Sequence, residues 1–162
     1  MADPRERLAA QQAALVRALV AGGPVPDGFA PERVRATSEA LARKRARQVA
    51  KAWPALALNP QFTQRFLSYA VRNPPPGGSL ADGLAFAGRL ASTGELNGNA
   101  RVEWLAARSR LRHRRGYRPR RGPFLGAVIT GSPRRLVAVV RVPGLGERWV
   151  PVPLPSRSAR TL

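Results

Sequence analysis

Cysteine is absent from this 162-residue chain, and histidine occurs once, as His113. The lack of cysteine excludes disulfides, thiolate zinc sites, iron–sulfur clusters and a cysteine nucleophile. A single histidine excludes a multi-histidine metal centre and a proton relay between histidines. The nine acidic residues are scattered, without the cluster of carboxylates that a hard cation needs. We therefore expect this chain to bind no metal and no cofactor.

Catalytic arrangements are missing as well. His113 lies between Arg112 and Arg114, whose charges would disfavour its protonation. The chain contains no G-x-S-x-G nucleophile elbow, no Walker A motif and no dinucleotide-binding fingerprint, and the Gly-Ser-Pro sequence at 131–133 is typical of a hairpin turn. We predict that the protein is not an enzyme and has no catalytic residues.

The shortage of acids leaves 28 basic residues against nine acidic ones and a net charge of +19. All but two of the basic residues are arginine, the exceptions being Lys44 and Lys51. A GC-rich genome explains the preference for arginine over lysine, but not the shortage of acids. A charge of this size attracts polyanions or acidic protein surfaces.

Long apolar runs are also lacking. The longest candidate, residues 13–21, is interrupted by Arg17. A signal peptide needs an uninterrupted apolar core of about 7–15 residues, and a membrane span about 18 apolar residues or more. We predict a cytoplasmic protein without a membrane span, although its basic charge also fits peripheral attachment to an anionic membrane.

Hydrophobic residues make up 44% of the chain, enough for the core of one compact domain. Apolar residues at helical spacing predict helices over residues 4–21, 31–53, 59–72, 79–92 and 99–112. Asp3 is the expected N-cap of the first helix, and Ser79 that of the fourth, with Asp82 at its capping-box position. Trp53 and Trp104 are expected in the core.

Two of these helices have well-marked apolar faces. The first presents a stripe of Leu8, Gln12, Leu15, Val16 and Leu19. The inner face of the second is expected to carry Val34, Leu41, Val49 and Trp53.

The pattern changes after residue 115. Residues 116–123 are a basic Pro/Gly/Arg connector, and strands are predicted over 124–130, 135–142 and 147–152. Pro151 confines the last strand to an edge, and the three strands form an antiparallel meander on the helices. The predicted fold is α+β: a helical bundle of about five helices (1–115), the connector, a small three-stranded sheet (124–154) and a frayed tail (155–162).

Two basic segments are candidate binding surfaces. Residues 108–121, RSRLRHRRGYRPRR, contain eight arginines and no acid, and residues 42–51 of the second helix read ARKRARQVAK. Arginine pairs with phosphates and carboxylates, and Tyr117 could stack on a base, although solvated helix faces also carry such charge. The candidate residues for binding a partner or nucleic acid are Arg43, Lys44, Arg47, Lys51, Arg108, Arg112, Arg114, Arg115, Tyr117, Arg118, Arg120 and Arg121.

The expected edge strand is a second kind of candidate site. An open edge can accept an extended peptide as a further strand. Arg141, Arg148 and Trp149 would flank the added strand, and the two arginines favour an acidic peptide.

Five segments together resemble a known family. They are LVRALVAGGPVPDGF at 15–29, VRATSEALARKRARQVAKAWPAL at 34–56, FTQRFLSYA at 62–70, PPP at 74–76 and DGLAFAGRL at 82–90. The order resembles a group of actinobacterial proteins of unknown function that looks like a branch of the bacterial "putative DNA-binding domain" family. The resemblance covers about residues 6–110. Trp53-Pro54 and the aromatic helix are its most specific features.

The resemblance implies an accessory role. Members of the wider family act with multinuclear non-haem iron-dependent oxidative enzymes that modify ribosomally made peptides. The partner enzyme would hold the iron, and this chain would help to present the peptide. The family's R-x-x-V-Y-R-x-N motif is absent here, where Val34-Arg35-Ala36-Thr37 occupies the same region, so contacts made through that motif do not carry over. The alternative is a nucleic-acid-binding protein that uses the arginine-rich surface. A third hypothesis is a purely structural or dimerising module.

Overall fold

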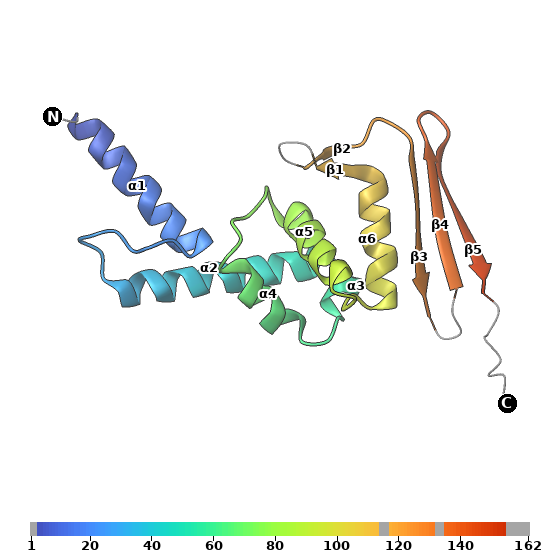
Figure 1. Cartoon of the computed structure of the whole chain (residues 1–162), viewed down its shortest axis with the longest axis horizontal. Helices are drawn as coiled ribbons and strands as arrows, with labels where there is room; N and C mark the ends of the chain where they lie inside the picture. The colour runs from blue at the N-terminus through green and yellow to red at the C-terminus, as the bar shows by residue number, and fades with distance from the viewer. Residues whose placement is uncertain (1–2, 114–116, 132–134, 155–162) are drawn as a thin grey trace.

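The structure is a computed structural model that describes residues 3–113, 117–131 and 135–154. In this part of the chain six helices precede the strands (Figure 1), namely α1 (Pro4–Ala21), α2 (Pro31–Ala52), α3 (Pro54–Ala57), α4 (Phe62–Ala70), α5 (Ser79–Ser92) and α6 (Gly98–Arg110). The strands are β1 (Leu111–His113), β2 (Tyr117–Pro119), β3 (Phe124–Thr130), β4 (Arg135–Val142) and β5 (Gly146–Pro153). The α+β class and the C-terminal antiparallel meander β3-β4-β5 are confirmed.

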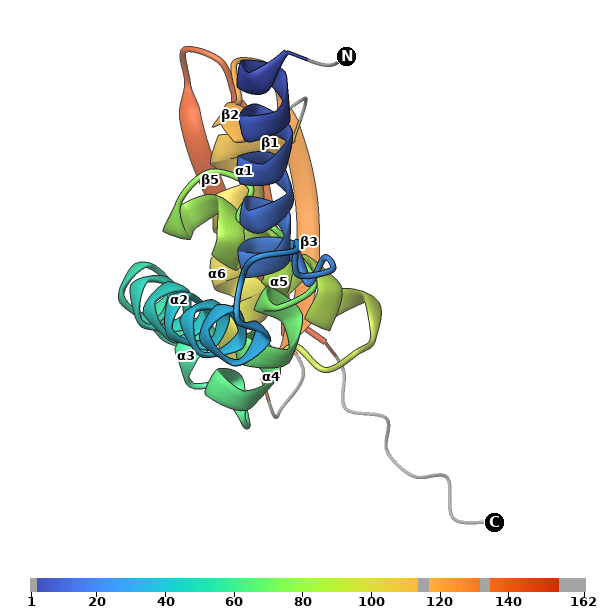
Figure 2. The ribbon, with the colours of Figure 1, turned by 90° about the vertical axis from the view of Figure 1, so that its left-hand side faces the viewer.

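Helix α1 has the predicted bounds and the predicted N-cap. The Asp3 carboxylate accepts a hydrogen bond from the Arg5 amide at 3.1 Å, and Gly22 ends the helix with a φ of 67°. Its apolar stripe, however, is mostly exposed, because Leu8 and Val16 each keep 55% of their surface in contact with solvent and Ala18 is the one buried residue. The helix packs mainly on α2 and projects from the body (Figures 1 and 2).

The core lies between α2, α4 and α5. Phe66 packs edge-on against Phe86, with ring centroids 5.2 Å apart, and Tyr69 lies 5.3 Å from Phe86. Val34, Val49 and Trp53 are buried as predicted. The prediction that Leu41 lies on the inner face of α2 is wrong: Leu41 is exposed, and the small residues Ser38, Ala42 and Ala46 are buried there instead. Small side chains at these positions let neighbouring helices approach closely.

Trp53 fixes the distance between α2 and α5. Its side chain is 1% exposed, and its backbone N–H donates to Val49 O at the end of α2. A Cβ atom on Gly83 would lie 2.2 Å from Nε1 of the Trp53 indole. The backbone of α5 therefore rests directly on the indole ring, and only glycine fits at position 83.

Asp82 does not form the predicted capping box. The N-cap of α5 is Gly78, not Ser79, and no side chain caps this helix. Asp82 is 2% exposed and accepts two hydrogen bonds from Arg45 of α2, each 2.9 Å long. Arg45 also donates to the carbonyl oxygens of Ala70 and Asn73. The bidentate pair with Arg45 supplies the hydrogen-bond donors that a carboxylate needs once it is removed from water.

The region after α2 also differs from the prediction. Pro54 ends α2 but begins the additional short helix α3, whose amides at Ala55 and Leu56 donate to the Glu103 carboxylate of α6. The third predicted helix begins at Phe62, not at Asn59. Asn59 is buried in the preceding loop, where it hydrogen-bonds Glu95 O and the Asn97 amide. These contacts join the chain before α4 to the start of α6.

Helix α6 ends at Arg110, two residues before its predicted end. Leu111–His113 pairs instead with Tyr117–Pro119, inside the predicted connector, as the antiparallel ribbon β1–β2. The Arg120 amide closes this ribbon on the helix by donating to Arg110 O at 2.6 Å. Residues 114–116, residues 132–134 of the predicted turn and the predicted tail at 155–162 lie outside the described residues.

One face of the β3-β4-β5 sheet packs on α6. Gly126 of β3 makes this approach close, because a Cβ there would lie 2.6 Å from a methyl carbon of Leu105. Val139, which pairs with Gly126 in the register, is fully buried. β5 is an edge strand and carries Pro151, as predicted.

We expect Gly83→Ala to destabilise the fold, although alanine is the better helix former by about 1 kcal/mol. The added methyl group would overlap the Trp53 indole, and overpacking of this kind costs about 1–3 kcal/mol. Urea denaturation followed by circular dichroism measures the difference in the free energy of unfolding.

The matched control is Gly88→Ala in the same helix. A Cβ at Gly88 meets one atom, Nε1 of Trp104, at an ordinary 3.8 Å. This variant should be neutral or more stable by up to about 1 kcal/mol. Equal stability of the two variants would contradict the close packing of α5 on Trp53.

Candidate binding surface at the end of helix α6

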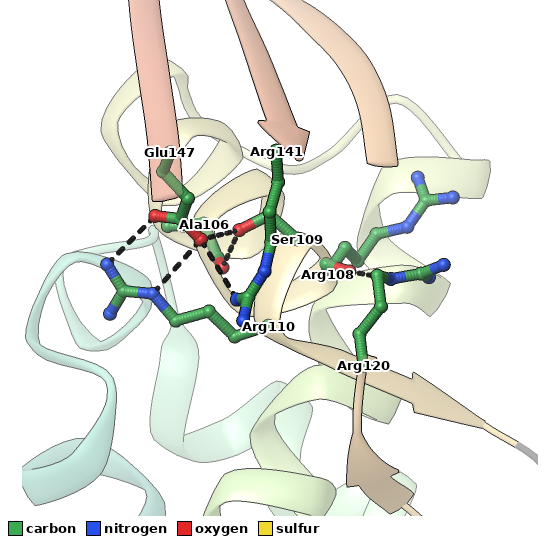
Figure 3. Close-up of polar contacts among 7 residues, drawn as sticks. All are labelled: Ala106, Arg108, Ser109, Arg110, Arg120, Arg141 and Glu147. Atoms are coloured by element: carbon green, nitrogen blue, oxygen red, sulfur yellow. Dashed lines mark hydrogen bonds and ion pairs between the residues drawn. The ribbon is translucent and has the colours of Figure 1, made fainter. Parts of the chain in front are cut away.

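The basic segment 108–121 folds back on itself at the end of α6. The ribbon register places Arg112 opposite Arg118. The Arg120 side chain returns to the helix, where its Nε donates to Arg108 O at 3.1 Å (Figure 3). A cation at this position also interacts favourably with the carbonyl end of the helix dipole. The local sequence therefore gathers several arginines at one helix end.

Three of these residues, Arg108, Arg112 and Arg120, form what we call the arginine cluster. Together they line an open hollow of about 520 Å³, and Leu84, Trp104 and Leu111 add apolar lining. The guanidinium of Arg108 stacks 4.6 Å from the ring centre of Trp104, and that of Arg120 lies 4.8 Å from the ring centre of Phe124. Within the described ranges, no carboxylate pairs with any of the three. The stacking holds Arg108 and Arg120 in place without neutralising them.

The electrostatics of the arginine cluster favour an anion. Burial, and then the positive charges of Arg108, Arg112 and Arg141, lower the pKa of Arg120 below its usual value. Like charges held together repel one another, and a bound anion would relieve that repulsion. Guanidinium groups form paired hydrogen bonds with carboxylates and phosphates. The hollow can therefore bind an anionic group next to an apolar one.

Glu147 joins the sheet to α6 beside this cluster. Its carboxylate accepts hydrogen bonds from the Ser109 hydroxyl and from Arg110, whose Nη2 lies 3.2 Å from Oε2, and it pairs with Arg141 at 3.5 Å (Figure 3). Burial acts to raise the pKa of Glu147. The hydrogen bonds from Arg110 and Ser109 and the charges of Arg110 and Arg141 outweigh burial, so that the pKa lies below its ordinary value.

The structure separates the two basic segments of the sequence. Helix α2 runs into α3 beside the beginning of α6, whereas the arginine cluster lies where α6 ends (Figure 1). Four predicted residues on α2 are exposed: Arg43, Lys44, Arg47 and Lys51. On the other segment Arg118 and Arg121 are exposed, Tyr117 pairs with His113 through the backbone, and Arg114 and Arg115 lie outside the described residues.

The three predicted peptide-edge residues lie on different faces of the sheet. Trp149 pairs with Val139 and shares its α6-facing side, where Trp149 is half-buried. Arg141 contacts Glu147 on that same side, and Arg148 points to the opposite face, where it is exposed. The structure therefore brings these three residues to the same end of the sheet, but it does not place them on the same face.

Sequence reasoning missed the Ser109–Glu147 contact and the role of Trp104 in the hollow. Trp104, expected in the core, is only half-buried. One signal was present: Glu147 is the one acidic residue after Glu103, within a strongly basic stretch. A lone acid there has many potential partners, so the sequence does not say which arginine it contacts.

The remaining cavities and side-chain groups of the described residues are weaker candidates for a functional site. A larger hollow of about 590 Å³ lies over α4 and α5, away from the arginine cluster, and is lined by residues such as Gln64, Tyr69 and Arg89. No group of three or more His, Cys, Asp or Glu side chains in the described ranges could hold a metal ion. No helix in these ranges is long and apolar enough to cross a membrane.

We expect Glu147→Gln to lower the free energy of unfolding by about 1–2 kcal/mol at pH 7, because it removes the ionised partner of Arg110 and Arg141. Since the folded-state pKa of Glu147 is lowered, its contribution is present above the ordinary pKa of about 4.3 and is lost as the pH falls through the folded-state value. Urea denaturation at several pH values between 7 and 3 should show the two proteins converging in acid.

Glu39→Gln is the control for this measurement. Glu39 forms an exposed pair with Arg43 within α2, and such pairs contribute about 0.5 kcal/mol or less. A deficit in Glu147→Gln that did not change with pH, or an equal deficit in Glu39→Gln, would contradict this account.

Comparison with known proteins places the chain among actinobacterial relatives. Residues 9–92 match the family described as "SCO6045-like, C-terminal domain". A protein of Streptomyces avermitilis described as "UPF0276 protein" is 47% identical over 114 residues, which cover 68% of this chain and 22% of that protein. The chain thus spans less than a quarter of the length of this curated relative. No solved structure matches it. The family match covers more than half of the residues, and the chain belongs to the SCO6045-like, C-terminal domain family.

Proposed function

We propose that this protein is a non-catalytic accessory protein that acts beside a UPF0276-type protein. In this proposal the partner is an iron-dependent oxidative enzyme, and the chain helps it to recognise or modify a ribosomally made peptide. The observation that carries the proposal is the Streptomyces relative, because a segment 47% identical to this chain makes up 22% of a longer protein described as "UPF0276 protein". Two parts that are joined in one protein commonly act together.

The arginine cluster supports the peptide part of the proposal. Arg108, Arg112 and Arg120 lie around a hollow that also has apolar lining, and within the described ranges no carboxylate pairs with them. A peptide with acidic and aliphatic side chains would complement both features. The peptide's carboxylates would pair with the arginines while its apolar side chains contact Trp104 and Leu84.

The partner is tested directly by co-purification. We expect the tagged full-length chain to retain a UPF0276-type protein from the same organism at about 150 mM salt, where surface charge alone is screened within about 8 Å. Size-exclusion chromatography of the mixture should show a complex of defined stoichiometry. Failure to retain this protein at moderate salt would overturn the proposal.

The peptide site is tested with the variant Arg108→Gln/Arg112→Gln/Arg120→Gln. Its affinity for a fluorescent precursor peptide encoded beside the partner should fall at least about tenfold, since each lost charge-assisted hydrogen bond is worth about 1.5–3 kcal/mol before screening. The control Arg43→Gln/Lys44→Gln/Arg47→Gln removes the same charge from α2 and should change peptide affinity less than about twofold.

Duplex DNA distinguishes the nucleic-acid alternative. If the charge acts only through long-range attraction, both triple variants should weaken DNA binding to a similar degree, and binding should be lost at physiological salt. Sequence-preferring DNA binding that persists at that salt and depends on the arginine cluster would favour the alternative over the peptide.

A further inference from the structure

The sheet has a second apolar face, which points away from α6. Strand alternation and the register place alternate residues of each strand on this face. From β3 and β4 it carries three directly paired positions, Leu125–Val140, Ala127–Ala138 and Ile129–Leu136. We call this surface, together with its continuation on β5, the outer sheet face.

β5 completes the outer sheet face. In the strand register Arg148 lies opposite Val140, Val150 opposite Ala138, and Val152 opposite Leu136. Each of the three strands thus contributes three residues to this face, and Arg148 is the one charged residue among these nine. Leu125 is 76% exposed and Val150 is 48% exposed. All helices lie on the other side of the sheet (Figures 1 and 2), and no described residue covers this face.

Such a surface is unusual for a sheet that ends in solvent. Antiparallel sheets with one solvated face alternate apolar and polar residues, whereas sheets covered on both faces are apolar on both. Isolated exposed apolar residues are common, but a contiguous apolar patch is typical of an interaction site. The apolar residues on the outer face of β3, β4 and β5 therefore indicate a second layer that another molecule supplies.

A second copy of the chain fits poorly as that layer. Three strands about 4.8 Å apart and seven residues long, at about 3.3 Å each, give a face of roughly 330 Å². A stable interface needs about 800 Å² on each side, so the contact would have to extend onto the basic surroundings. Two copies, each with a net charge of +19, would repel one another there. The basic surroundings of this face instead favour a different protein, one whose apolar patch is bordered by carboxylates.

One end of the outer sheet face lies close to the arginine cluster, as the pairing of the strands shows. The row that contains Leu125, Val140 and Arg148 is next to the row of Phe124, Arg141 and Glu147. Phe124 stacks with Arg120, and Glu147 contacts Arg110. A protein seated on the outer face would therefore reach the end of the sheet at which the arginine cluster lies.

We propose that the outer sheet face is the docking surface for the UPF0276-type partner, which contributes an apolar patch bordered by carboxylates. This inference rests on the proposed function and assigns it a surface. The partner forms the missing second layer on the sheet, and Arg148 pairs with one of its carboxylates. The arginine cluster then remains free to bind the peptide at the border between the two proteins.

The test compares two double variants of the full-length chain. Leu125→Gln/Val150→Thr makes the outer sheet face polar, and Leu8→Gln/Val16→Thr makes similar changes at the exposed stripe of α1, where both residues are 55% exposed. All four side chains are substantially exposed, so the melting temperatures should stay close to that of the original chain. Affinity for the UPF0276-type protein from the same organism is measured by isothermal titration calorimetry.

We expect the outer-face variant to bind at least tenfold more weakly and the α1 variant to bind within twofold of the original chain. If the original chain binds and the outer-face variant binds equally well, the docking surface is wrong while the accessory function stands. If the original chain does not bind the partner, both proposals fail. A dimer at micromolar concentration that the outer-face variant abolishes would assign this face to a second copy and overturn the inference.

Discussion

The contact of α5 with α2 is the constraint on which the rest of the structure depends. Two adjacent residues make it: the Asp82 carboxylate pairs with Arg45, and the Gly83 backbone rests on the Trp53 indole. Removing one partner of a buried ion pair typically costs about 3–5 kcal/mol, because the other charge is left unpaired. With α5 in place, the chain continues into α6, and α6 supports the sheet. The positions of the described candidate binding residues after residue 98 therefore depend on this contact.

The position of the sheet depends on a second contact in which a carboxylate pairs with arginine. Glu147 binds Ser109 and Arg110 of α6, as well as Arg141 of its own sheet. This one carboxylate neutralises part of the basic end of α6, and the arginine cluster beside it has no such counter-charge among the described residues. The end of α6 therefore carries arginines of two kinds: Arg110, whose charge Glu147 neutralises, and those of the electropositive hollow, which have no paired carboxylate among the described residues. The proposed peptide and partner surfaces meet at this point.

Periodicity and caps predicted most of the elements well, because they depend on neighbours along the chain. Asp3 and Pro4 begin α1, and the apolar runs between turn residues after residue 123 predicted three strands close to their observed bounds. The errors arose where distant residues compete. Asp82 suits a local cap but is held by Arg45, 37 positions away, and the end of α6 is set by the ribbon that Arg120 closes. Leu41 fits the inner face by spacing, but the smaller Ala42 is buried there.

The sequence by itself determined the α+β order and the excess of positive charge, since composition and local residue patterns need no knowledge of the third dimension. It also singled out residues 108–121 as the most basic segment. Only the tertiary structure decided which arginines are neutralised, which face of the sheet α6 covers, and that Arg141, Arg148 and Trp149 do not share a surface. Those outcomes depend on contacts between residues far apart in the chain, whose pairing is set by the packing of whole helices and strands.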